Sequence, residues 1–167
     1  TKKVKGPIAI AKFTHSGSQI IDWTPEGSEA ETRNLYPSFL KFIQESMQQI
    51  EDRGQKVELA GILYHLGEND MSWSPFRDGA SARLQSLVNQ SREDLDLPEL
   101  PWFVSQQPPT DDKQVNQIDV TAKIAEVAAA DPYLIHIKAF SLPPRKRNWF
   151  WTPRVSSHWE KNSPRAG

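Results

Sequence analysis

Short apolar runs alternate with longer amphipathic segments along most of the chain, and this alternation most constrains the fold. Apolar runs typical of buried strands occupy residues 8–13, 57–64, 100–104 and 133–140. Segments with apolar side chains at helical spacing lie between them, at residues 36–53, 81–95 and 114–130. Strands that are joined through helices by short connections predict an α/β protein with a parallel sheet and helices on its faces.

The composition indicates a single globular domain and excludes several kinds of site. A chain of 167 residues that is 37% hydrophobic and 25% charged is able to bury a core. No apolar stretch approaches the roughly 20 residues that cross a bilayer, so we expect no membrane partner. The chain has no cysteine, which excludes disulfides, thiolate metal sites and a cysteine nucleophile. Because it does not begin with methionine, we expect it to be a fragment.

Residues 145–167 differ from the rest of the chain and are predicted to form a separate tail after a domain at residues 1–144. This tail holds six Lys or Arg residues against one acidic residue, and three of the six tryptophans, while residues 1–144 are acidic. It shows neither helical nor strand periodicity. An alternative function for the chain is therefore contact with nucleic acid or a membrane surface through this tail, although we expect neither partner for the main domain.

A polar block at residues 64–70, Tyr-His-Leu-Gly-Glu-Asn-Asp, directly follows an apolar run. Because ligands of open α/β sheets bind beyond the carboxyl ends of strands, His65, Glu68 and Asp70 are candidate site residues. The alternative interpretations are structural. His65 would then be a buried histidine bonded to backbone, Glu68 a solvated or capping carboxylate, and Asp70 the N-cap of a helix over residues 72–76.

Three blocks in this order resemble the carbohydrate esterase family of sialic acid-specific acetylesterases, a branch of the SGNH hydrolase superfamily. The family's lysine, Gly-Gly-Thr and Asp-Trp correspond to Lys12, residues 16–18 and Asp22-Trp23. Its aromatic-His-Gln-Gly-Glu-Ser-Asp corresponds to the block at residues 64–70, and its Leu-Pro-Phe to residues 100–103, Leu-Pro-Trp-Phe. The order and spacing of the blocks carry the resemblance, which covers residues 8–144.

The resemblance implies a fold, a reaction and a substrate class. The fold would be a three-layer α/β/α sandwich of the flavodoxin-like SGNH type, incomplete at its N-terminus. The reaction would be serine ester hydrolysis of an acetylated carbohydrate, without cofactor or metal. Relatives of this kind are secreted or periplasmic, so we expect the same location for the parent protein.

The resemblance also assigns roles to individual residues. Glu68 and His65 match the carboxylate that supports the catalytic histidine and a position next to the site, so they are the catalytic candidates. The expected oxyanion or substrate-binding positions are Gly17, Ser16, Gly67 and Asp70. Ser16 and Ser18 are expected to be turn residues and not nucleophiles. Leu66 replaces the family's glutamine and Ser16 its first glycine, and a lost oxyanion donor costs on the order of 100-fold in rate.

The family's nucleophile block, Gly-Gln-Ser-Asn, does not occur in the chain. We therefore expect the chain alone not to hydrolyse acetylated sugars, and a non-catalytic carbohydrate-binding relative is an alternative. A glycosidase would need two acids flanking a sugar bond, but Glu68 and Asp70 would point apart on an extended segment.

The tail also suggests a change of reading frame near Pro144. Shifting the codons of residues 148–152 by two bases forces Leu-Val-Leu-Asp, because Trp has one codon and the Asn and Phe codons end in a pyrimidine. The same shift across residues 158–160 forces Leu-Gly. Allowed codons then spell a helix of the family's closing pattern, so we hypothesise that the tail is out of frame.

Overall fold

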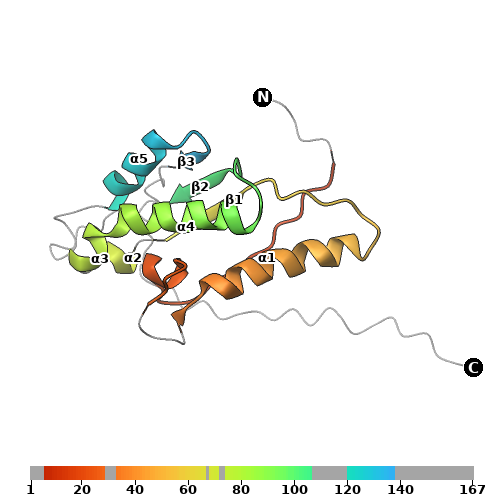
Figure 1. The fold of residues 1–167 in the computed structure, drawn as a ribbon, viewed down its shortest axis with the longest axis horizontal. Helices are drawn as coiled ribbons and strands as arrows, with labels where there is room; N and C mark the ends of the chain where they lie inside the picture. The colour runs from red at the N-terminus through yellow and green to blue at the C-terminus, as the bar shows by residue number, and fades with distance from the viewer. Residues whose placement is uncertain (1–5, 29–32, 67, 72–73, 107–119, 138–167) are drawn as a thin grey trace, which may run out of the picture.

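The computed structural model describes residues 6–28, 33–66, 68–71, 74–106 and 120–137 (Figure 1). The described elements follow in the order η1 (Ile20–Trp23), α1 (Tyr36–Glu51), β1 (Ile62–His65), α2 (Glu68–Met71), α3 (Ser74–Asp78), α4 (Ala80–Asp94), β2 (Trp102–Ser105), α5 (Val120–Ala130) and β3 (Leu134–His136). The predicted tail at residues 145–167, the closing pattern proposed within it, and Gly67 lie outside the described residues.

The three strands form one parallel sheet in the order β1-β2-β3. Ile62 lies opposite Trp102 and His65 opposite Ser105, and Trp102 is in turn paired with Leu134. Helices α4 and α5 connect successive strands and pack against each other (Figure 1). The α/β class and the parallel sheet are therefore confirmed.

The sheet has one covered face and one open face. Alternate strand residues on the covered face are buried, namely Ile62, Tyr64, Trp102, Val104 and Leu134. They share one hydrophobic core with buried side chains of α1, α4 and α5. On the other face, Leu63 is 73% exposed and Ile135 is 38% exposed. The described residues thus form two layers of the expected three.

The strand predicted at residues 8–13 is wrong. This segment has no strand assignment, and Ile8 and Ile10 are 72% and 83% exposed. An apolar run forms a strand only where a neighbour satisfies its backbone N–H and C=O groups, and no described strand pairs with it. Phe13 alone reaches the core, where its ring stacks on Phe42 and meets Trp23 edge-on.

The other predicted elements are present with shifted or shorter bounds, and parts of the predicted helix at residues 114–130 and strand at residues 133–140 lie outside the described residues. Helix α1 ends at Glu51, before Gly54, whose φ of 73° favours glycine. Strand β1 begins only at Ile62, five residues later than predicted. Residue 61 must be small, because a Cβ there would lie 3.0 Å from the Pro101 carbonyl oxygen and 3.1 Å from the Phe103 ring.

A buried ion pair fixes α4 to the segment that precedes β3. The Arg92 guanidinium donates to the Asp131 carboxylate at 2.5 Å and to the Leu100 carbonyl oxygen at 3.0 Å. Both charged side chains are about nine-tenths buried. Removing one member of such a pair leaves an uncompensated buried charge, so the pair holds the two β-α-β units in one arrangement.

Within the described part of the chain, no helix has the length and apolar character needed to span a membrane.

Candidate functional site

The loop that carries Gly17 is held by a buried carboxylate. The Asp22 side chain is 1% exposed and accepts hydrogen bonds from the Gln19 backbone N–H and from the Arg33 guanidinium, both at 2.8 Å. Arg33 also donates to the Gly17 carbonyl oxygen. Gly17 itself has a φ of 69°, a conformation that glycine adopts without steric cost. The Gly17 turn is therefore fixed from both sides, and Arg33 is a positioning residue that the sequence did not indicate.

Ser16 lies in a turn at residues 16–17, as expected, and Ser18 directly follows that turn. The Ser18 hydroxyl is buried, donates to the His15 carbonyl oxygen at 3.0 Å and accepts the Trp23 indole N–H at 3.0 Å. Ser16 is exposed, and its carbonyl oxygen lies 3.1 Å from the His15 ring nitrogen Nδ1. Ser18 is thus engaged as donor and acceptor beside the turn, which leaves it unsuited to attack a substrate.

The Gly17 loop and the turn after β1 meet in space. The Ile20 backbone N–H donates to both oxygens of the Asp70 carboxylate, at 3.1 and 3.2 Å. The Asn69 side-chain amide donates to the Ser18 carbonyl oxygen at 3.3 Å. Two sequence blocks about fifty residues apart therefore form one site at the carboxyl end of β1.

Asp70 faces the protein interior. It lies within α2, is fully buried, and its carboxylate is turned to Ile20, while residues 72–73, at the start of the helix that it was expected to cap, lie outside the described residues. Burial raises the pKa of Asp70 to about 6, although the Ile20 N–H and the Arg83 charge favour the carboxylate. Asp70 therefore holds the Gly17 loop in place by accepting the Ile20 N–H.

His65 is exposed on the open face of the sheet, so its interpretation as a buried histidine is wrong. Its ring nitrogen Nδ1 lies 2.9 Å from the Ser105 hydroxyl. Ser105 was not a sequence candidate, although it ends the next parallel strand and lies directly opposite His65. Strand alternation was the available signal: because Tyr64 points into the core, its neighbour His65 must point out.

Glu68 is the first residue of α2, and its catalytic role remains a prediction. The argument against a glycosidase assumed that Glu68 and Asp70 lie on an extended segment. This assumption is wrong, because both residues lie in helix α2. Positions two apart do not face each other on a helix either. Leu66 is half-buried and packs against the core, so this departure from the family pattern places an apolar side chain beside the site.

Four aromatic rings of the hydrophobic core pack against one another next to this site. Trp23 meets Phe39 and Tyr64 edge-on with ring centroids 6.1 Å apart, and Trp102 meets the same two rings. Such pairs add about 0.5–1.5 kcal/mol each beyond their buried area. The Tyr64 hydroxyl has no hydrogen-bond partner among the described residues, and burial raises its pKa.

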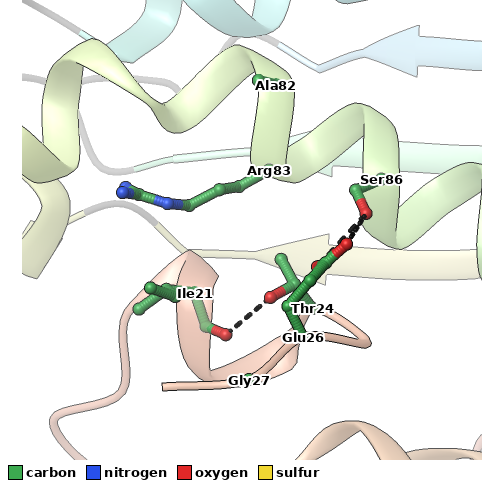
Figure 2. A pocket seen from close by; sticks show the side chains of 7 residues that line it. All are labelled: Ile21, Thr24, Glu26, Gly27, Ala82, Arg83 and Ser86. Atoms are coloured by element: carbon green, nitrogen blue, oxygen red, sulfur yellow. Dashed lines mark hydrogen bonds between the residues drawn. The ribbon is translucent and has the colours of Figure 1, made fainter. Parts of the chain in front are cut away.

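A shallow pocket of about 290 Å³ lies between the η1 loop and α4 (Figure 2). The Ser86 hydroxyl donates to the Glu26 carboxylate at 3.2 Å across it, and the Thr24 hydroxyl donates to the Ile21 carbonyl oxygen at 2.9 Å. Its lining includes none of the predicted site residues. No group of three or more His, Asp or Glu side chains in the described segments is arranged to hold a metal ion.

Comparison with known proteins places these blocks in context. A family model described as carbohydrate esterase, sialic acid-specific acetylesterase, matches residues 1–154. An X-ray structure of a protein from Arabidopsis thaliana superposes with a TM-score of 0.54 at 20% identity, covering 77% of this chain and 47% of that one. The chain thus spans about half the length of the Arabidopsis protein, and at this identity the likeness shows the fold alone. No curated protein matches the chain.

Proposed function

The chain belongs to the carbohydrate esterase family of sialic acid-specific acetylesterases, and from this premise we propose that it is part of a hydrolase that releases acetate from O-acetylated carbohydrates. The observation that carries the proposal is the contact between the two family blocks. Asp70 and Asn69 hold the Gly17 loop against the carboxyl end of β1, where a parallel sheet presents its ligand site.

Each residue of the site is proposed to have its own role in acyl transfer. The backbone N–H of Gly17 would donate to the oxyanion of the tetrahedral intermediate, within a turn that Arg33 and Asp22 hold. Glu68 and His65 would orient the base and the sugar, and Ser16 and Gly67 would contribute to binding of the substrate. The Gly-Gln-Ser-Asn block is not among these residues. We therefore propose that the chain supplies the residues that stabilise the oxyanion and orient the base. On this proposal it binds acetylated sugars but does not cleave them.

Binding of an acetylated sugar tests this proposal on the chain itself. We expect an O-acetylated sialic acid to shift the backbone NMR signals of Gly17 and Asn69, and the same sugar without its acetyl group to shift them much less. Acetate release is then measured for the gene's full product, with Glu68→Gln as the variant. Removing a group that orients the base should lower the rate by about 100-fold. Absence of both binding and release would contradict the proposal.

Leu66 favours a second candidate, a non-catalytic carbohydrate-binding relative. An apolar side chain packed on the core replaces an amide that would help to hold the oxyanion. Binding of the acetylated sugar by the full product, with no acetate release and none gained on Leu66→Gln substitution, would favour this candidate over the esterase.

The remaining family expectations are also proposals. We propose that further polypeptide covers the open face and completes a three-layer SGNH-type sandwich, because parallel sheets are generally buried on both faces. Secretion or a periplasmic location is proposed for the parent protein on the family resemblance.

A further inference from the structure

We propose that Asp70 is a proton-controlled latch on the Gly17 loop: the neutral acid keeps the loop docked at the carboxyl end of β1, and ionisation of the acid releases it. This inference deepens the proposed function and rests on it, because the Gly17 backbone N–H is the proposed oxyanion donor. The site would then be best ordered in mildly acidic solution.

The latch is a buried contact between two sequence blocks. The Ile20 backbone N–H donates to both oxygens of Asp70, at 3.1 and 3.2 Å, and the two residues are 1% and 0% exposed. The described residues alone produce this burial, and further polypeptide can only increase it. Because Ile20 lies on the carboxyl group, the group is shielded from water while the loop is docked and meets water when the loop moves away.

The charged groups around Asp70 give its ionised form little support. Asp22, on η1, is a second buried carboxylate whose charge opposes ionisation of Asp70, and the cation Arg33 is paired with Asp22 at 2.8 Å. Arg83 faces Asp70 from α4 and favours the ionised form, but its guanidinium donates to the Phe76 carbonyl oxygen at 3.1 Å. Within the described part of the chain, Asp70 forms no ion pair. Loss of water therefore outweighs the attraction of Arg83.

Tyr64 faces the same cluster from β1 and stays neutral. Burial raises its pKa, and the charges of Asp70 and Asp22 raise it further. Its hydroxyl has no hydrogen-bond partner among the described residues, so it gives the Asp70 carboxylate no bond. The second contact to the loop, from the Asn69 amide to the Ser18 carbonyl oxygen at 3.3 Å, does not titrate. The proton on Asp70 is therefore what changes the strength of docking.

Docking of the loop and protonation of Asp70 are linked equilibria. In the docked state burial raises the pKa of Asp70 to about 6, whereas contact with water in the open state returns it towards the ordinary 3.8. The docked state thus binds the proton more tightly. Its advantage is complete below about pH 4 and is lost as the pH rises through about 6, and the difference between the two pKa values limits the change in the docking equilibrium to about 100-fold.

Amide hydrogen exchange of the unaltered chain measures docking without any sugar. Protection of the Ile20 N–H, corrected for its intrinsic rate, should fall by roughly 10-fold to 100-fold between pH 4.5 and 7.5. The Trp102 N–H, which donates to the Tyr133 carbonyl oxygen at 2.8 Å, is the reference for unfolding of the whole chain. A low concentration of urea should accelerate exchange at Trp102 and not at Ile20, because release of a loop exposes little surface. Protection of Ile20 that is constant with pH, or that follows Trp102 in urea, overturns the latch.

Three variants assign the pH dependence. Asp70→Asn keeps an acceptor for the Ile20 N–H but cannot ionise, so protection of Ile20 should no longer change with pH. Asp52→Asn, at an exposed position after α1, and His15→Gln, which removes an exposed imidazole of the loop, should both keep the change. If His15→Gln abolishes it and Asp70→Asn does not, the imidazole is the sensor and the latch is wrong. Circular dichroism melting curves show whether each variant is folded, and the unaltered chain decides the matter if one is not.

Binding of an O-acetylated sialic acid at pH 5.0 and 7.5 tests the consequence for the site. The unaltered chain should bind the sugar more weakly at pH 7.5, by at most about 100-fold, and Asp70→Asn should bind it equally at both values. Equal affinity for the unaltered chain would show that the latch does not control the site and would overturn the proposal. No binding at either pH contradicts the proposed function instead. The exchange data need no sugar, so the two failures are distinguishable.

Discussion

The Asp70 carboxylate accepts the backbone N–H of Ile20 with both oxygens, at 3.1 and 3.2 Å, and so joins two segments that are fifty residues apart in the sequence. One fully buried acidic side chain thereby places the Gly17 loop against the end of β1. The arrangement has an energetic cost, because burial disfavours the charged form of a carboxylate.

Asp70 should make stability fall as the pH rises. Its pKa in the folded protein is about 6, above the ordinary value of 3.8, because burial outweighs its hydrogen bonds. The folded state therefore holds the proton more tightly than the unfolded state, and this contribution is complete below about pH 4 and lost as the pH rises through about 6. At neutral pH the loss amounts to at most about 3 kcal/mol.

Denaturant unfolding at pH 4.5 and 7.5 would measure this effect. Asp70→Asn keeps an acceptor for the Ile20 N–H but cannot ionise. The free energy of unfolding of Asp70→Asn relative to the original chain should be higher at pH 7.5 than at pH 4.5. Parallel pH profiles for the two proteins would show that Asp70 does not titrate in this range.

Replacing Arg33 should loosen the Gly17 loop. Arg33→Met removes a donor to the Gly17 carbonyl oxygen and leaves the buried Asp22 carboxylate with one partner fewer. Because the Arg33 side chain is 37% exposed, we expect a loss of only about 1–2 kcal/mol in unfolding free energy. Hydrogen exchange at Gly17 and Ser18 should accelerate, whereas Arg53→Met, at an exposed position, should change neither quantity.

The buried ion pair between Arg92 and Asp131 should contribute much more to the free energy of unfolding than an ion pair on the surface. Arg92→Met leaves a buried carboxylate without its cation, and we expect a cost of about 3 kcal/mol or more. Lys41→Met breaks the exposed pair between Lys41 and Glu45 and should cost at most about 0.5 kcal/mol. Equal shifts in the urea midpoint for the two variants would refute this ranking.

Gly61 should not tolerate even a methyl group. A Cβ there would lie 3.0 Å from the Pro101 carbonyl oxygen, which accepts the Ile62 N–H at the start of β1. Gly61→Ala must therefore move one strand, and we expect a loss of about 1–3 kcal/mol. Ala60→Ser, at the exposed neighbouring position, serves as the matched control in thermal unfolding, and it should melt with the original chain.

The frame hypothesis for the tail is tested on the nucleic acid. Sequencing the gene through the codons for residues 140–167 should show a one-step frame change near Pro144. Independent copies of the gene that encode the written tail in one uninterrupted frame would refute it.

The helices were predicted from the sequence more accurately than the strands, of which one was wrong and the other three had different bounds. Apolar residues at helical spacing, such as Leu84, Leu87 and Val88, mark α4 because a helix carries its own hydrogen bonds. The run at residues 8–13 has strand composition, but its conformation depends on a partner elsewhere in the chain. Pairing of strands is a long-range property, so strand bounds were the least accurate part of the prediction.

The candidate site was predictable only where a motif was local. The blocks that contain Gly17 and Asp70 were found from their own residues, and their contact through Ile20 emerged only in three dimensions. Ser105 carries no local signal, because its relation to His65 arises from the register of two strands forty residues apart. Arg33 was missed for the same reason.

The open face of the sheet also shapes which sequences this protein can accept. Along β1 and β2, every second residue meets the core, and its neighbours, among them Leu63, meet solvent. Tolerance to polar replacement should therefore alternate with a period of two residues. A chain that kept Leu63 and Phe103 apolar through long divergence would reveal selection on that face for something other than folding of these two layers.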